Sequence, residues 1–321
     1  MREASFIEKN KEKWLKIERN IRNKTDVSPD ELAENYIELT NDLAFAQTFY
    51  PGSKTKEYLN ELSVFVHQSI YRDQRTSSNQ FLDFFKYVVP KAVFESRRTI
   101  FYSFLILLLG TVIGWLSAHY DMDYIRLILG DQYVDTTIEN IKQGNPAAIY
   151  ESGGALGSSL GITIHNIRVA IFAFAYGIFF SVGASYIIFS NGIMLGAFHY
   201  IFYKYKVLGI AMSAIWIHGA FEISVIVLAG GCGLLIGNSI LFPKTYSRVA
   251  SFKKEMKKAG TILVSTIPFF IIAGTLEGFV TRHYHVSLFL SLSIIVVSFF
   301  IILFYYIYYP YKLSKKHLWK N

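Results

Sequence analysis

The chain of 321 residues has little charge, a single cysteine and few prolines. Charged residues make up 17% of it, against about 25% in an average soluble domain. With hydrophobic residues at 52% and a mean hydropathy of +0.31, this deficit excludes an ordinary soluble protein. The one cysteine, Cys232, excludes a disulfide framework and a zinc site built on paired cysteines. Seven prolines and 22 glycines exclude collagen and a Pro/Gly-rich disordered chain. We therefore expect a polytopic helical membrane protein.

The charges divide the chain into two parts. Residues 1–95 hold 14 Lys and Arg with 15 Asp and Glu, whereas residues 96–321 hold 18 and 9. We place the domain boundary near residue 95, between a cytoplasmic helical domain (1–95) and a transmembrane domain (96–321). The positive excess stands beside hydrophobic segments, which is typical of membrane topology. We expect membrane lipid around the chain and no nucleic acid partner.

The first part is expected to be a small helical bundle. Apolar residues at three- and four-residue spacing predict helices over 5–22, from Pro29 to about 49, and over 54–72. Ser28 is the expected N-cap of the second helix. Residues 81–90 are typical of an amphipathic helix that approaches the membrane. No catalytic constellation stands out, so we interpret this part as a docking or oligomerisation module.

The second part contains several candidate membrane spans, each of which needs about 20 apolar residues. Four stretches fit: 99–118, 167–189, 261–280 and 286–309. The region between them is ambiguous, because 192–203 is short for a span and 207–241 is long, at ~52 Å as a helix. The glycine cluster at 230–233 is the expected break in the longer segment. We expect six crossings with 191–203 as one of them; the alternative is four crossings with 191–206 re-entrant.

The loops predict the orientation, since Lys and Arg are enriched in cytoplasmic loops. Loop 119–164 has six acids against two bases, whereas loop 242–260 has six bases against one acid. Lysines also follow the last span. We therefore expect both termini and loop 242–260 in the cytoplasm and loop 119–164 outside. Residues 131–141 are expected to form a short surface helix within that outer loop.

Two acids, Glu222 and Glu277, lie within the apolar spans, where a charged group costs roughly 2.5–3.5 kcal/mol. His218 precedes Glu222 by four residues, so both share one helical face. The plain interpretation is a structural polar network with a His–Glu hydrogen bond inside one helix. An ion or proton pathway and catalysis are the alternatives. Two ligands are fewer than zinc sites need, so we expect no metal, and we expect no cofactor.

Other polar residues are candidates for the same network. Asn166 and Arg168 stand at the expected outer end of the second span, where Arg168 either snorkels to the interface or reaches Glu222 or Glu277. Asn191, followed by Gly192, marks a helix break or an N-cap inside the membrane. The full predicted intramembrane network is Asn166, Arg168, Asn191, His218, Glu222 and Glu277.

Small-residue spacing recurs along the spans. Glycines four residues apart let helices approach closely. The pairs are Gly110 with Gly114, Gly192 with Gly196, Gly233 with Gly237, and Gly274 with Gly278, and Gly219 follows His218 directly. The repetition predicts tight helix packing, within the chain or across a homodimer.

Four segments together resemble a known family. They read HNIRVAIFAFAYGIFFSVGA, SNGIMLGAF, HGAFEISVIVLAGGCGLLIG and AGTLEGFVT. This series is similar to the stage II sporulation protein M family of bacterial membrane proteins, over about residues 95–310. The most specific signals are Asn166 with Arg168, Asn191 with its glycines, and His218 with Gly219 and Glu222.

The resemblance implies a multi-pass protein of the bacterial cytoplasmic (inner) membrane. The sporulation member is a scaffold that recruits two peptidoglycan-degrading partners, an amidase and a lytic transglycosylase, during engulfment. This chain differs from it by the extra domain of roughly 95 residues. The resemblance implies a non-enzymatic scaffold in envelope or peptidoglycan remodelling, with cell-wall hydrolases or other envelope proteins, or a second copy of the chain, as partners.

Two other functions remain open on the residues themselves. A transporter or channel would place its polar site around His218 and Glu222, in the region 191–241. An intramembrane hydrolase would need a nucleophile beside His218, for which Ser213 and Ser224 are the candidates. We expect no enzyme, because no nucleophile, base and oxyanion site come together in the sequence.

Overall fold

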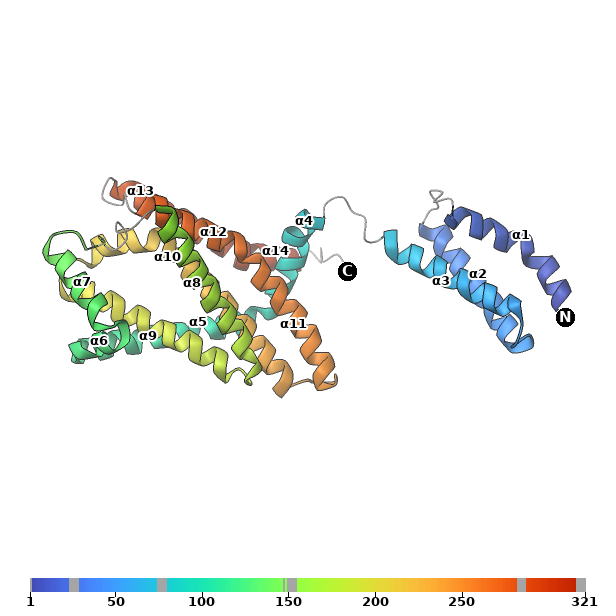
Figure 1. Ribbon diagram of the computed structural model, residues 1–321, viewed down its shortest axis with the longest axis horizontal. Coiled ribbons are helices and arrows are strands. Elements are labelled where there is room, and N and C mark those ends of the chain that lie inside the picture. The colour runs from blue at the N-terminus through green and yellow to red at the C-terminus, as the bar shows by residue number, and fades with distance from the viewer. Residues whose placement is uncertain are drawn as a thin grey trace. The chain divides into compact units, whose positions relative to one another are not determined.

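In the computed structural model, the residues described are 2–22, 29–73, 80–146, 148, 155–281 and 287–315. These residues form helices joined by turns, and no strand occurs among them (Figure 1). The predicted all-α fold is confirmed. Contacts divide the chain into two compact units, Met1–Leu82 and Asp83–Asn321.

The first unit is a bundle of three helices that match the predicted ones. They are α1 (Glu3–Arg22), α2 (Pro29–Phe49) and α3 (Lys54–Asp73). Its core includes Leu39, Leu59 and Val66, all fully buried. The Trp14 Nε1 atom donates a hydrogen bond to Asp42 across the α1–α2 interface, at 2.8 Å. The predicted N-cap Ser28 lies outside the described residues.

The second unit contains the long apolar helices. Its major helices are α5 (Val89–Tyr120), α8 (Ala155–Ala175), α9 (Val182–Lys204), α10 (Leu208–Leu241), α11 (Arg248–Ser265), α12 (Ile267–Thr275) and α13 (Leu288–Leu303). Its short helices are α6 (Met122–Leu129), α7 (Asp131–Lys142) and α14 (Tyr309–Lys315), and α4 (Gln80–Asp83) precedes it. Turns of π-helix occur at η1 (Phe84–Val88), η4 (Leu276–Val280) and η6 (Phe304–Tyr308), and a 3₁₀ turn at η3 (Tyr176–Ile178).

Several of these segments are suited to a bilayer. In the described residues, five helical stretches are long and apolar enough to cross a membrane. They are Gln80–Tyr120, Val182–Lys204, Leu208–Leu241, Arg248–Val280 and Leu288–Lys315, and a shorter apolar helix covers Thr163–Ile178. The central one is α10, which contacts α5, α8, α9, α11, α12 and α13. Its most apolar stretch is 72% buried, against 17% for the last span, so α13 offers most of its surface to lipid.

The chain turns between α8 and α9 at an unexpected place. Phe180 and Ser181 have positive φ angles of 52° and 67°, and this left-handed pair reverses the chain. The predicted span 167–189 is therefore wrong, because its two halves belong to different helices. The segment 192–203 is the second half of α9, whose 23 residues reach roughly 34 Å. An unbroken helix of that length replaces the re-entrant alternative over 191–206.

The glycine cluster in α10 does not break the helix, so that prediction is also wrong. A carbon added at Gly231 would lie 2.7 Å from Ile100 Cα of α5, and one added at Gly233 would lie 2.7 Å from Ala184 Cβ of α9. Real Cβ atoms essentially never lie within 3.0 Å of such neighbouring atoms. The glycines thus let three helices approach while the helix stays continuous.

The glycine pairs mostly pack helices within the chain. A carbon added at Gly114 would lie 2.8 Å from Ile193 Cα, and a carbon added at Gly196 would lie 2.6 Å from the backbone nitrogen of Trp115. Gly110 and Gly192 meet at the same α5–α9 crossing. The other pairs also lie inside the unit: Gly237 packs on the turn at Ser181, and Gly274 and Gly278 are buried. Gly219 differs, because a carbon added there would lie 3.8 Å from Ile215 Cγ2, which is an ordinary van der Waals contact.

The membrane unit begins at Asp83, earlier in the chain than the boundary near residue 95 suggested by the charges. The reason is packing: Val89, Ala92 and Val93 are buried in the main core of this unit. The hydroxyl groups of Tyr305 and Tyr309 also donate to the carbonyl oxygens of Phe85 and Lys86, at 2.8 and 3.1 Å. The last span thus packs against the beginning of the first.

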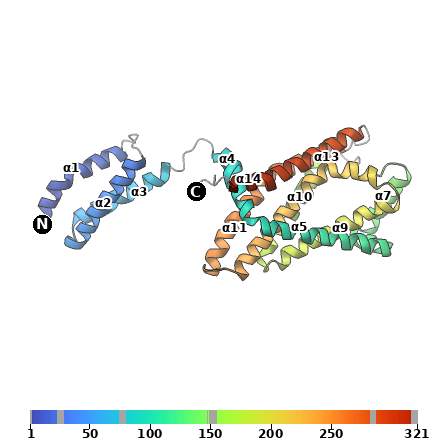
Figure 2. The same cartoon turned by 180° about the vertical axis from the view of Figure 1, so that it is seen from behind.

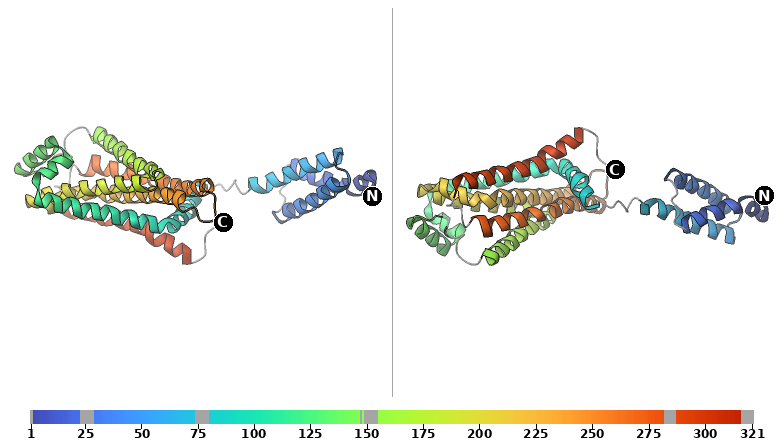
Figure 3. Two further views of the ribbon diagram at one scale, coloured as in Figure 1. Left: turned by 90° about the horizontal axis from the view of Figure 1, so that it is seen from below. Right: turned by 90° about the horizontal axis from the view of Figure 1, so that it is seen from above.

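The two ends of the membrane unit differ. Figures 2 and 3 show α6 and α7 at one end, and the start of α5 with α14 at the other. The α6–α7 pair rests on the ends of α9 and α10 through Ile125, Val134 and Phe202. The predicted surface helix over 131–141 is confirmed as α7.

Candidate functional site

The polar residues of the spans gather near the α6–α7 end, where α8, α10 and η4 meet. The His218 ring of α10 lies between two groups of the η4 region. Its Nδ1 atom is 3.0 Å from the Thr281 hydroxyl, and its Nε2 atom is 3.8 Å from Glu277 Oε1. The His218 and Glu277 side chains are each 4% exposed. An imidazole, a carboxyl and a hydroxyl thus share one buried site.

Glu222 lies one turn further along α10 and takes its partner from another helix. The Asn166 amide of α8 donates a hydrogen bond to Glu222 Oε1. His218 and Glu222 therefore both bond across helices, in place of the expected bond to each other. This arrangement ties three segments of the unit together.

The local backbone at Glu277 is unusual. The segment η4 is a turn of π-helix, which often marks a functional site inside a longer helix. Glu277 Oε2 is buried and has no hydrogen-bond partner within the part of the chain that the structure describes. A buried polar atom without a partner costs free energy. The site therefore has one unused acceptor, at which a proton or a small cation would be stabilised.

Two of the predicted network residues do not join the cluster. Arg168 is exposed on α8 and has no hydrogen bond or ion pair with any described residue, so neither predicted acid is its partner. Asn191 lies inside α9, where its amide donates to the Ile187 carbonyl at 2.8 Å. The helix break predicted at Asn191 is wrong, because the side chain bonds within its own helix.

The sequence analysis missed three polar residues that the fold buries or pairs. Thr281 was hidden because it stands at the end of an apolar run, although it follows Glu277 by four residues, as Glu222 follows His218. The other two form a pair: Trp216 Nε1 donates to His199 Nε2 at 3.1 Å, joining α10 to α9.

The chemistry open to this cluster is limited. The hydroxyl groups of Ser213 and Ser224 donate to the carbonyls of Ile210 and Ala220 in their own helix, at 2.8 and 2.6 Å. Neither is aimed at His218. In the described residues, no group of three or more His, Cys, Asp or Glu is placed to hold a metal ion. The geometry suits helix-to-helix bonding and the holding of a proton.

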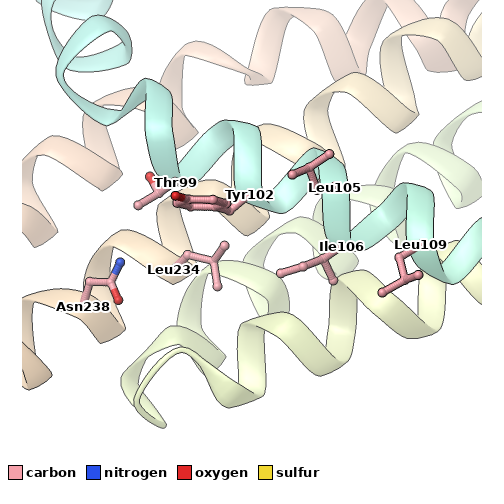
Figure 4. A pocket seen from close by; sticks show the side chains of 7 residues that line it. All are labelled: Thr99, Tyr102, Leu105, Ile106, Leu109, Leu234 and Asn238. Carbon is pink, nitrogen blue, oxygen red and sulfur yellow. The ribbon is translucent and has the colours of Figure 1, made fainter.

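A separate cavity of about 450 Å³ lies between α5 and α10, toward the other end of the unit. Figure 4 shows its walls, which include Thr99 and Tyr102 from α5 and Asn238 from α10. No charged side chain lines it. It is distinct from the polar cluster, with which it shares no residue.

Comparison with known families finds two matches. The family model described as Stage II sporulation protein M matches residues 103–282, which include the whole polar cluster. A model described as a domain of unknown function (DUF8413) matches residues 4–72, the three helices of the first unit. Comparison with curated proteins and with solved structures gives no match. Since the first match covers more than half of the chain, the protein belongs to the stage II sporulation protein M family.

Proposed function

We propose that the protein is an integral membrane scaffold that organises partners in cell-envelope or peptidoglycan remodelling. One observation carries the proposal: α6 and α7 form a folded helical pair outside the apolar spans. A scaffold needs a surface that is held in place by the rest of the protein and is accessible to partner proteins. Family membership gives a second, general support.

The helical pair is anchored on one face and open on the other. Ile125 and Val134 are almost fully buried against the spans, whereas Leu127 is 80% exposed. The Arg126 guanidinium of α6 bonds Asp131 and Asp135 of α7, at 3.1 and 2.6 Å, and so links the two helices. A surface with an exposed leucine among acidic residues favours a protein partner with an apolar contact and basic groups.

The charge distribution of the loops supports an orientation for this scaffold in the inner membrane. The acidic α6–α7 pair would face outward, and the basic loop 242–260 and both termini would face the cytoplasm. The polar cluster lies near the outward end and would keep the spans in register beneath the helical pair. The first unit would then bind a cytoplasmic partner.

The test is co-purification from the native cell followed by mass spectrometry. Leu127→Glu should remove cell-wall hydrolases or other envelope proteins from the tagged protein, because it places a charge in the proposed contact. The matched control is Gln132→Glu, which adds the same charge at an exposed polar position of the same pair. Equal partner lists from the wild type and Leu127→Glu would refute recruitment by this surface.

A second function, movement of a proton or cation, is favoured by Glu277 Oε2, which has no hydrogen-bond partner among the described residues. In the scaffold interpretation, Glu222→Gln weakens the bond from Asn166 and lowers stability or assembly. In the transport interpretation, Glu222→Gln folds and keeps its partners but loses flux. Liposomes containing the wild type separate the two, because a scaffold gives no proton or cation flux.

A further inference from the structure

A second cavity, of about 640 Å³, forms a groove between α5, α10 and the last span. Its walls include aromatic and aliphatic side chains: Phe101, Phe104, Trp216, Phe299, Leu303 and Ile307. It shares no residue with the polar cluster or with the cavity of Figure 4. Its volume falls in the range of ligand sites, roughly 300–1,000 Å³.

Three polar groups of these walls are already bonded within the protein. Trp216 Nε1 donates to His199, and the Ser224 hydroxyl donates to the Ala220 carbonyl. The Tyr306 hydroxyl lies 3.0 Å from Ser265 Oγ. The groove therefore presents an apolar surface, which suits a hydrocarbon-like occupant.

The mouth of the groove is positively charged. Arg97 lines it and uses one donor on the Phe94 carbonyl, at 2.7 Å, but has no carboxylate partner in the described ranges. Lys315 stands over the ring of Tyr311, another lining residue, with 4.7 Å from Nζ to the centroid. No Asp or Glu lines the groove. A negatively charged group of an occupant would form an ion pair with these cations.

The length of the groove matches one leaflet. The thirteen residues from Phe299 to Tyr311 rise by roughly 18 Å of helix, and half of a ~30 Å hydrocarbon core is ~15 Å. Arg97 stands just before the apolar run of α5, and Lys315 is the last residue of the last stretch. The two cations thus stand at the end of the groove that is remote from Phe299.

We propose that this groove binds one anionic phospholipid. One acyl chain lies along the aromatic wall, and the phosphate accepts hydrogen bonds from Arg97 at the mouth. The guanidinium is suited to this role, because it bonds phosphate through two donors at once. Basic pockets between transmembrane helices are known to hold anionic headgroups. The cavity of Figure 4 has no charged side chain and offers no such pairing.

The test measures lipid binding to the full chain in detergent by native mass spectrometry. The probes are phosphatidylglycerol and phosphatidylcholine with identical oleoyl chains. We expect the wild type to bind phosphatidylglycerol at least about tenfold more tightly, as one charged hydrogen bond provides. Arg97→Gln should remove this preference. The matched control, Arg98→Gln, changes an exposed arginine that does not line the groove and should keep it.

Three results would overturn the proposal. One is equal binding of the two lipids by the wild type. Another is equal loss of preference in Arg97→Gln and Arg98→Gln, which would show a diffuse charge effect. The third is a lipid-free dimer that dissociates on Ser224→Trp, which would make a second copy the occupant. If Arg97→Gln does not fold, a photoreactive acyl chain on phosphatidylglycerol should label Phe104 or Leu303 of the wild type, and labelling elsewhere alone would refute the site.

Discussion

The crossing of α5 and α9 depends on residues that have no side chain. Gly196 is the sharpest case, because a carbon added there would lie 2.6 Å from the Trp115 nitrogen, a backbone atom that cannot rotate away. We expect Gly196→Ala to destabilise the protein by about 1–3 kcal/mol, the usual cost of overpacking. Thermal unfolding in detergent, followed by the loss of monodisperse protein, measures the change.

Gly161 provides the matched control for this prediction. It is also a helical glycine, in α8, but no atom of the described residues outside its own helix backbone lies within 4 Å of an added carbon. Gly161→Ala should leave the unfolding temperature unchanged or raise it slightly, since alanine favours helix over glycine. If both substitutions lowered stability equally, close backbone packing would not be the reason for glycine at Gly196.

The sequence predicted the residues of the site better than their contacts. His218, Glu222, Glu277 and Asn166 stand out because ionisable or amide groups are costly in an apolar span. Their partners depend on the relative rotation of α8, α10 and η4, which is a property of packing between distant segments. The π-helical turn at η4 brings Glu277 to His218, and no residue pattern signals that turn.

At the scale of elements, the α6–α7 pair is expected to respond to acid. The Arg126 guanidinium, bonded to Asp135 at 2.6 Å, holds the pKa of this carboxyl below its ordinary value of 3.8. Because the pKa of Asp135 is lower in the folded state than in the unfolded state, the ion pair contributes its full stabilisation to the fold above about pH 3.8. The contribution is lost as the pH falls through the lowered pKa. We therefore expect α7 to loosen below about pH 4.

Amide hydrogen exchange of the full chain, corrected for intrinsic rates, measures this loosening. Peptides from α7 should lose protection in acid before peptides from α10, which serve as the internal reference. Arg126→Gln should lower the protection of α7 already at neutral pH and remove its acid-dependent loss, because an Asp135 carboxyl with the same pKa in the folded and unfolded states gives no pH dependence. An unchanged pH profile in Arg126→Gln would show that the ion pair does not hold the two helices.

The hydrophobic pattern of the sequence predicted the helices, but the conformation of the residues at the turns decides where each helix begins and ends. The long apolar runs correctly indicated helices, as did the amphipathic pattern of α1, α2 and α3. The turn at Phe180 and Ser181 was missed, because neither residue favours positive φ and the run stays apolar around it. Asn191 and Gly192 looked like a break but stand inside α9, since a buried helix accepts glycine where another backbone approaches.

At the scale of the whole molecule, the chain joins two units with separate cores. The first unit buries Leu39, Leu59 and Ala46 completely, and its three helices match a family model of their own. Its positive and negative charges are nearly balanced, in contrast to the apolar α13. Such a unit resembles an independent soluble domain attached to a membrane protein.

We predict that a fragment of residues 1–82 folds alone. It should be soluble and helical, and it should unfold cooperatively on heating, as followed by circular dichroism. Leu39→Ala should destabilise it by about 2–5 kcal/mol, because that side chain is fully buried. Ile37→Ala, on the same helix but 59% exposed, should change stability by no more than about 0.5 kcal/mol. A broad melt, or equal effects of the two substitutions, would mean that the core forms only beside the membrane unit. The first unit would then be part of the membrane assembly and not a separate docking module.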